Sequence, residues 1–175
     1  LSLCLGSFPT PPLQVGHSLI NPADSELTFI IWQLRLPRIV LAILVGAALA
    51  MAGAILQSIV RNPLASPDVI GITSGAALAA VLFIALLSSH VSIGWLPVAA
   101  MLGALFAALL VVSLAWQRGI SPARLVLVGI GLAAAMGAVT TLLIVMSDDS
   151  AAMSAYTWLT GSLYAAQWVD VASLL

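Results

Sequence analysis

Long apolar runs alternate with short polar segments along this chain of 175 residues. A helix that crosses a bilayer needs about 20 largely apolar residues. By that measure, the pattern predicts four complete membrane-spanning helices, at residues 39–60, 69–87, 93–116 and 125–146. Shorter apolar stretches at residues 1–8 and 169–175 predict parts of two further spans. The expected fold is an all-α, polytopic helical bundle, in which residues 1–175 form one partial transmembrane domain.

The segments between the spans differ in length and composition. Residues 9–31 hold four prolines together with Asp24 and Glu26, which predicts an external loop. Residues 88–95 and residues 117–124 are short and predict tight turns. Residues 147–168 are longer and half apolar, and they predict a short helix that lies at the membrane interface or dips into the protein.

Every predicted span carries small residues four positions apart, which places them on one face of a helix. These sets are Gly46, Ala50 and Ala54; Gly71, Gly75 and Ala79; Gly103 and Ala107; and Gly129, Ala133 and Gly137. In lipid the hydrophobic effect does not drive helices together, so close backbone approach and dispersion must do so. The sets therefore predict tightly packed helices.

The composition supports a membrane protein and excludes several chemistries. Hydrophobic residues make up 62% of the chain, charged residues 6%, and the mean hydropathy is +1.20. A soluble domain carries roughly a quarter of its residues as charged ones, so lipid must cover most of this surface. There is no basic patch for nucleic acid. All five basic residues are arginine, and the missing lysine excludes a Walker-type phosphate loop and Schiff-base chemistry. Any nucleotide hydrolysis must then come from another chain.

Few residues offer metal or redox chemistry. Cys4 is the one cysteine, so an intrachain disulfide and a thiolate metal cluster are both excluded. His17 and His90 are isolated in predicted loops, with no second ligand at helical or turn spacing, so no metal site is expected. The middle thirds of the predicted spans hold no ionisable residue, although ion-coupled carriers usually place one there.

The segment "RNPLASPDVIG" (61–71) is polar and breaks helices between two apolar runs. Pro63 and Pro67 each remove a backbone donor and restrict the preceding residue, so a helix cannot run through. We expect the next span to begin at Pro67 with Ser66 as its cap. Two interpretations stay open. The segment is either an ordinary cytoplasmic turn or a turn against a translocation path, where irregular backbone is tolerated inside a membrane.

Five segments together resemble the permease subunits of the FecCD family, which belong to ABC importers for iron–siderophores, ferric citrate, haem and cobalamin. They are "LRLPR" (34–38), "GAALAMAGAILQ" (46–57), "RNPLASPDVIGITSGA" (61–76), "SPARLVLVGIGLA" (121–133) and "WLTGSL" (158–163). The resemblance implies a ten-span subunit, of which this chain holds the end of the first span to the beginning of the sixth. It also implies a location in the bacterial cytoplasmic (inner) membrane.

The resemblance further implies partners for the chain. These are a second permease subunit, identical or related, two ATP-binding subunits, and a periplasmic or lipid-anchored substrate-binding protein. On this pattern ATP and Mg²⁺ bind to the partner ATPase, this chain is not an enzyme, and it holds no cofactor of its own.

The resemblance also implies roles for particular residues. Arg35 and Arg38 match external arginines that meet acidic residues of the binding protein; the alternative is that both reach for lipid phosphates. The turns Asn62–Leu64 and Ser121–Ala123 match those that narrow the cytoplasmic end of the path. There Leu64 would supply an apolar plug and Asn62 a hydrogen-bonding anchor, with Pro63 between them in the turn.

Two further points qualify this assignment of roles. Pro122 departs from the small polar residue that some relatives carry, which argues against a gate built on a hydroxyl group. Gly129, Ala133 and Gly137 are candidates to line the pathway, although helix packing explains the same residues.

Arginine placement favours one orientation in the membrane. Arg61, Arg118 and Arg124 fall on one side of the predicted topology, and Arg35 and Arg38 on the other. The excess of three to two favours the first side as cytoplasmic.

Two other classes of protein remain as alternatives. A secondary carrier or channel not driven by ATP would need an intramembrane charge or polar filter. A passive membrane scaffold would not need prolines around Asn62 or paired external arginines.

Overall fold

The computed structural model describes residues 10–20, 26–62, 65–117, 119, 121–164 and 166–174, with the backbone alone at residues 17, 19 and 26. The elements in this part of the chain are helices. The expectations for residues 1–8, Cys4, Pro63, Leu64 and Arg118 lie outside the described residues. The chain divides into two compact units: unit 1 is residues 1–50 with 162–175, and unit 2 is residues 51–161.

Unit 1 is built around a helix that continues through a proline. Helix α1 (Pro12–Ile20) precedes α2 (Glu26–Phe29), which passes directly into the π-helical segment η1 (Ile30–Arg35) and then into α3 (Leu36–Val60). Residues 36–50 of α3 and the short helix α9 (Trp168–Leu174) complete the unit. Leu41 of α3, Ala166 and Val171 of α9 are buried together.

The predicted loop at residues 9–31 is therefore wrong for most of its length. Pro12 takes the first position of α1, where a missing N–H costs nothing because that group has no helical partner. Pro37 lies just after η1, whose wider turn accommodates a proline inside a helix. As a result, the span expected at residues 39–60 is the second part of a longer apolar helix of 34 residues, Leu27–Val60.

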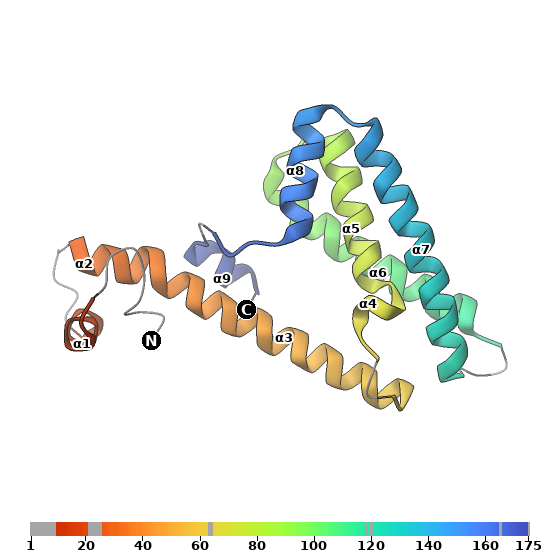
Figure 1. Cartoon of the computed structure of the whole chain (residues 1–175), viewed down its shortest axis with the longest axis horizontal. Coiled ribbons are helices and arrows are strands. Elements are labelled where there is room, and N and C mark those ends of the chain that lie inside the picture. The colour runs from red at the N-terminus through yellow and green to blue at the C-terminus, as the bar shows by residue number, and fades with distance from the viewer. Residues whose placement is uncertain are drawn as a thin grey trace. The chain divides into compact units, whose positions relative to one another are not determined.

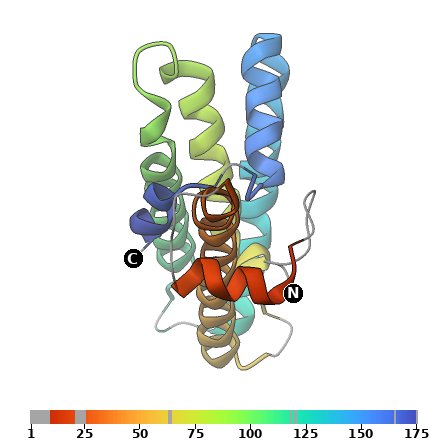
Figure 2. The same ribbon diagram turned by 90° about the vertical axis from the view of Figure 1, so that its left-hand side faces the viewer.

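Unit 2 is a bundle of antiparallel helices. After the end of α3 come α4 (Pro67–Ile70), α5 (Ile72–Leu82), the π-helical segment η2 (Phe83–Leu87), a short 3₁₀ turn (Ile93–Trp95), α6 (Leu96–Ala115), α7 (Pro122–Met146) and α8 (Asp149–Thr160). Helices α5, α6 and α7 pack on one another, and α8 lies back along η2 and the end of α7 (Figure 1, Figure 2). The short helix expected within residues 147–168 is confirmed as α8.

The predicted span at residues 69–87 is not one continuous helix. Gly71 has a φ of +83°, in the left-handed region that favours glycine, and it separates α4 from α5. The apolar helix that remains, Ile72–Leu87, is shorter than the three membrane-length helices, Leu27–Val60, Ile93–Ala115 and Pro122–Met146. The four predicted spans thus correspond to three long helices and one broken helix in the described residues.

Helices α5 and α6 approach so closely that glycine is required at their crossing. A Cβ atom on Gly75 would lie 2.7 Å from the carbonyl oxygen of Gly103 and would collide with Ala107. A Cβ atom on Gly103 would collide in turn with Ala79 and with the backbone of Gly75. The packing predicted from these small residues is confirmed here, whereas Gly46 of α3 has no atom within 4 Å of such a Cβ position.

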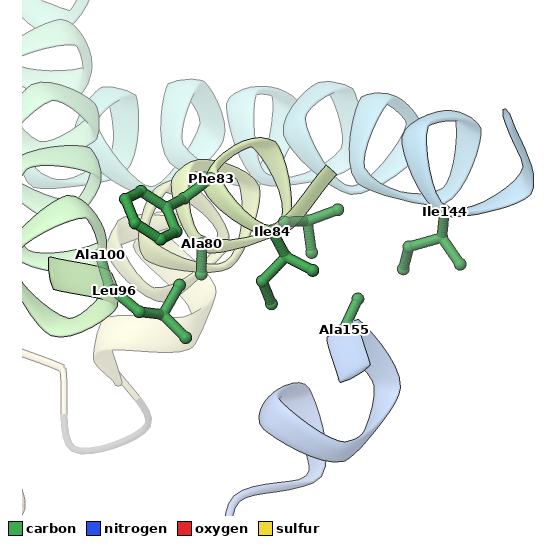
Figure 3. Packing of buried hydrophobic residues seen from close by; sticks show 8 residues of the cluster. Ala80, Phe83, Ile84, Leu96, Ala100, Ile144 and Ala155 are labelled. Atoms are coloured by element: carbon green, nitrogen blue, oxygen red, sulfur yellow. The ribbon is translucent and has the colours of Figure 1, made fainter. Parts of the chain in front are cut away.

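The buried apolar side chains of unit 2 form two clusters, one at each end. Figure 3 shows the first, where α5, η2 and the start of α6 meet the end of α7 and the middle of α8; its members are Ala80, Val81, Phe83, Ile84, Leu96, Ala100, Ile144 and Ala155. The second joins the end of α3 to α4, α6 and α7, and its members are Val60, Ala65, Ile70, Val111, Ala115 and Leu125. Outside these clusters large apolar side chains face outward, as at Phe106 (66% exposed) and Val145 (74%). Such extensive apolar exposure is typical of a surface that meets lipid.

Candidate functional site

The polar turn after α3 is held by backbone hydrogen bonds. Arg61 adopts a φ of +52°, and the Asn62 N–H donates to the Gln57 carbonyl at 3.2 Å, which is the bond that closes a Schellman-type helix end. The Ala65 N–H then donates to the Asn62 carbonyl at 3.1 Å. Two of the predicted gate residues, Pro63 and Leu64, lie between these groups and outside the described residues.

The two predicted gate turns lie at the same end of unit 2. Ala65 is buried in the second cluster with residues from the end of α6 and with Leu125 from the start of α7. Ser121 and Pro122 are exposed and begin α7, with Pro122 in its first turn. The Leu125 N–H donates to the Ser121 carbonyl at 3.0 Å. This end of the unit also carries Arg61 and Arg124, while Asp148 and Asp149 lie beyond the other end of α7.

Helix α4 rests on α7 through backbone contacts. A Cβ atom on Gly129 would lie 2.7 Å from Ile70 Cα and 2.8 Å from the Ile70 carbonyl oxygen. A Cβ atom on Gly71 would lie 3.1 Å from the Gly129 carbonyl oxygen and 3.2 Å from Ala133 Cβ. Two of the three pathway candidates, Gly129 and Ala133, therefore form the surface on which α4 packs. Gly137 is exposed and has open space around it.

The break between α4 and α5 is bridged by one side-chain hydrogen bond. The Thr73 hydroxyl donates to Asp68 Oδ1 at 2.7 Å, across Gly71. Ser66 occupies the cap position of α4 as expected, but its hydroxyl makes no capping bond.

The two predicted docking arginines have different surroundings, which the sequence did not distinguish. Arg35 is half-buried in η1, and its Nη1 donates to the Thr10 hydroxyl at 3.1 Å. Arg38 is exposed in the first turn of α3. Both lie in one continuous helical stretch, Arg35 at the end of η1 and Arg38 in the first turn of α3. Their role in docking stays a prediction.

Two tryptophans hold α1 and α9 against η1. The Trp168 indole N–H of α9 donates to the Trp32 carbonyl at 2.9 Å, and the Trp32 indole N–H donates to the Ser18 carbonyl at 3.1 Å. In a π-helical register the Trp32 carbonyl would accept from residue 37, five positions on, but Pro37 has no N–H. Trp168 therefore supplies the donor that Pro37 lacks. The sequence analysis missed the hydrogen bond between Trp168 and Trp32. The one sequence feature that could indicate it is a proline five residues after Trp32, which leaves the Trp32 carbonyl without a donor in a π-helical register.

Metal-binding side chains do not gather in the described part of the chain, where no group of three His, Cys, Asp or Glu residues lies together. His90 is exposed in the turn after η2. His17 belongs to α1, so its expected place in a loop is wrong, and its side chain lies outside the described residues.

Membrane-length apolar helices, packed through glycines and broken by short turns, define a polytopic helical membrane protein. The chain belongs to the FecCD transport family, whose family model matches residues 1–175. It is 50% identical over 173 residues to the achromobactin transport system permease protein CbrC of Dickeya dadantii (strain 3937), covering 99% of this chain and 50% of that protein. It is 43% identical over 176 residues to the probable siderophore transport system permease protein YfhA of Bacillus subtilis (strain 168), covering 98% and 51% of the two chains.

A solved structure shares the fold. It is an inward-facing conformation of a transporter assigned to the metal-chelate type of ABC transporter. The TM-score is 0.77 at 32% sequence identity, and the match covers 98% of this chain and 50% of that chain. The chain thus spans about half the length of the curated relatives it matches.

Proposed function

We propose that this chain is part of the permease subunit of an ATP-driven importer that carries an iron–siderophore or a related metal chelate across the bacterial cytoplasmic membrane. The observation that carries the proposal is the match along nearly the whole chain to achromobactin and siderophore transport permeases, in sequence, and to a metal-chelate ABC transporter, in fold. An ion-coupled carrier is not favoured, because the middle thirds of the predicted spans hold no ionisable residue.

The energy for transport comes from partner subunits in this proposal. The chain has no lysine for a phosphate-binding loop, so ATP and Mg²⁺ bind to two separate ATPase subunits. A second permease subunit completes the path, and a substrate-binding protein delivers the chelate. The end of unit 2 with Arg61 and Arg124 faces the cytoplasm, in agreement with the positive-inside rule.

Reconstitution of the full-length permease in vesicles tests this function. With the ATPase subunits, the binding protein and ATP, uptake of a radiolabelled ferric siderophore is expected, and omission of ATP or of the ATPase should abolish it. Uptake at full speed without the ATPase would show a secondary carrier and overturn the proposal.

The exposed Arg38 is proposed to dock the binding protein. A charge at the rim of an interface steers association and contributes little affinity, typically below about 1 kcal/mol, so Arg38→Glu should raise the concentration of binding protein that half-stimulates ATPase activity by about two- to fivefold. The increase should shrink in high salt. Arg35→Glu is expected to have the smaller effect on docking, because its guanidinium already bonds Thr10. An Arg38→Glu complex with unchanged stimulation would remove this role.

The turn that contains Asn62 and Leu64 is proposed as part of the cytoplasmic gate, together with Ser121 and Pro122. Disulfide crosslinking between cysteines at position 64 of the two permease subunits measures their separation with and without nucleotide. A crosslinking yield that depends on nucleotide supports gating, and equal yields in both states rule out a gate at this turn.

A further inference from the structure

Helix α1 lies across the long helix of unit 1 rather than along it. In Figure 1 it is seen nearly end-on, while η1 and the start of α3 run across the view, and in Figure 2 it is seen from the side. Two side-chain hydrogen bonds hold it there: the Trp32 indole N–H donates to the Ser18 carbonyl, and Arg35 Nη1 donates to the Thr10 hydroxyl just before α1. A helix that crosses a membrane-spanning helix in this way lies roughly parallel to the membrane plane, as interfacial helices do.

The contacts of α1 place it close to the edge of the hydrocarbon layer. Residues 39–60 hold no charged residue and are long enough to cross that layer, and Arg35 and Arg38 directly precede them. Charged side chains avoid the hydrocarbon, so its edge lies near these arginines. Tryptophan gathers at membrane–water interfaces, and the hydrogen-bonded indoles of Trp32 and Trp168 lie at this level. Helix α1 therefore lies at the depth of the lipid headgroups.

The two faces of α1 differ in their exposure. Val15 and Ser18 are buried on the face where α1 packs on α2 and η1. Leu13 and Ile20 are 89% and 80% exposed. A spacing of seven residues places these two side chains on one helix face, which lies roughly opposite Val15. Within unit 1, two large aliphatic side chains thus project from α1 on the side away from the long helix.

The chemistry of this exposed face fits lipid better than a protein partner that is recognised by charge. Residues Pro12–Ile20 include no Asp, Glu, Lys or Arg, so α1 offers no charge for the electrostatic steering typical of protein docking. Aliphatic side chains at this depth enter the boundary between headgroups and acyl chains, which is how interfacial helices bind. The neighbouring part of the long helix also exposes apolar side chains, as at Ile43 (65%), so the apolar surface continues towards the hydrocarbon.

We propose that α1 is an interfacial helix that lies in the headgroup layer of the bilayer, with Leu13 and Ile20 inserted among the lipids. Its bonds to the long helix, through Trp32 and Arg35, then tie the depth of that helix to the membrane surface. The inference goes beyond the proposed transport function and does not depend on which molecule is transported.

The test places a fluorophore, bimane, on single cysteines of the full-length permease, in a background without other cysteines, in phosphatidylcholine vesicles. Leu13→Cys and Ile20→Cys probe the apolar face, and Gln14→Cys is the matched control, because it is exposed on another face of the same helix. Lipids with a nitroxide near the top of the acyl chain should quench positions 13 and 20 about twofold more than position 14, and aqueous iodide about twofold less. Equal quenching at all three positions overturns the proposal.

A second pair of variants tests whether the apolar face holds α1 in the lipid. Leu13→Asp places a carboxylate on that face, and Gln14→Asp places one beside it. Both side chains are exposed, so neither substitution disturbs the packing of unit 1. With the fluorophore at position 20, Leu13→Asp should raise iodide quenching by about twofold, because a charge is costly among lipid chains. Gln14→Asp should leave it unchanged, and an equal response in the two variants would contradict the anchoring role of Leu13.

Contact with a protein would give a different result. If iodide reaches positions 13 and 20 freely in vesicles and the substrate-binding protein then protects them, the face docks that protein and the lipid proposal is wrong. These measurements need no ATP and no cargo. A failure of ATP-dependent uptake would therefore overturn the proposed function alone, whereas the quenching results decide the place of α1.

Discussion

Loss of the Trp168 indole N–H is expected to destabilise unit 1 because one backbone carbonyl then loses its donor. Trp168→Phe keeps an aromatic ring and removes the N–H that lies 2.9 Å from the Trp32 carbonyl oxygen. Since Pro37 has no N–H, the helix itself cannot supply a replacement in the π-helical register. The perturbation thus isolates one hydrogen bond between residues that are far apart in the sequence.

The size of the effect follows from the exposure of the pair. A buried acceptor left without a partner costs about 1–3 kcal/mol, and a typical hydrogen bond contributes about 1 kcal/mol net. The hydrogen bond itself is exposed, so water can replace the lost donor in part and the cost falls near the lower end. We expect Trp168→Phe to lower the free energy of unfolding by about 1 kcal/mol. Trp95→Phe is the control, since Trp95 is 59% exposed, and its cost should stay below about 0.5 kcal/mol.

A double-mutant cycle with Pro37→Ala tests the cause of this effect. An alanine at position 37 provides a backbone N–H, so the carbonyl freed by the proline gains a second donor. Trp168→Phe should then cost less in the Pro37→Ala background, with a coupling of about 0.5–1 kcal/mol. The assay is the unfolding of the purified full-length protein in mixed micelles under increasing denaturing detergent. Strict additivity of the two substitutions would refute the explanation, even if each alone changed stability.

Three further substitutions test the packing and the helix ends, each by the same unfolding assay. Gly103→Ala should destabilise by about 1–3 kcal/mol, because the added methyl group overpacks the contact with α5. Gly131→Ala is the control, since Gly131 is exposed in α7 and a Cβ there meets no atom within 4 Å; an equally small change in both variants would contradict the close approach. Arg61→Gly should stabilise by about 0.5–1 kcal/mol, since glycine adopts the φ of +52° without the cost that arginine bears, and a loss of stability would argue against the left-handed helix end. Ile144→Ala should lower the free energy of unfolding by about 2–4 kcal/mol, because it opens a cavity beneath α8. A loss below about 1 kcal/mol would count against the burial of Ile144 in this cluster.

Prolines misled the sequence analysis in one region and guided it in another. Pro12 is one of the four prolines that predicted a loop over residues 9–31, yet it lies in a helix, and Pro37 further along the chain does so too. Pro12 begins a helix where no donor is needed, and Pro37 follows a π-helical turn whose free carbonyl is satisfied by Trp168. The donor comes from the other end of the chain, so no local pattern could have shown it. By contrast, Pro67 does begin α4 as expected, because the first helical position needs no donor.

The small-residue sets show a similar division. Spacing of four residues places small side chains on one helix face, but it does not say which helix faces them. The structure pairs Gly75 with Gly103 and places Ile70 against Gly129, while Gly46 and Gly137 face open space. The spacing of small residues in the sequence therefore indicated a face of α7 suited to close packing. Only the structure showed that α4 is the element packed against it.

The sequence by itself determined that this chain is a helical membrane protein of the FecCD type without its own phosphate-binding lysine. Hydropathy and residue chemistry are local properties, so they can be recognised without knowing any contact. Only the tertiary structure decided where the broken helix at Gly71 rests, how the surroundings of Arg35 and Arg38 differ and which carbonyl Trp168 satisfies. Each of these depends on groups that the fold brings together from distant positions in the chain. Such contacts cannot be recognised from the sequence around any one of the residues involved.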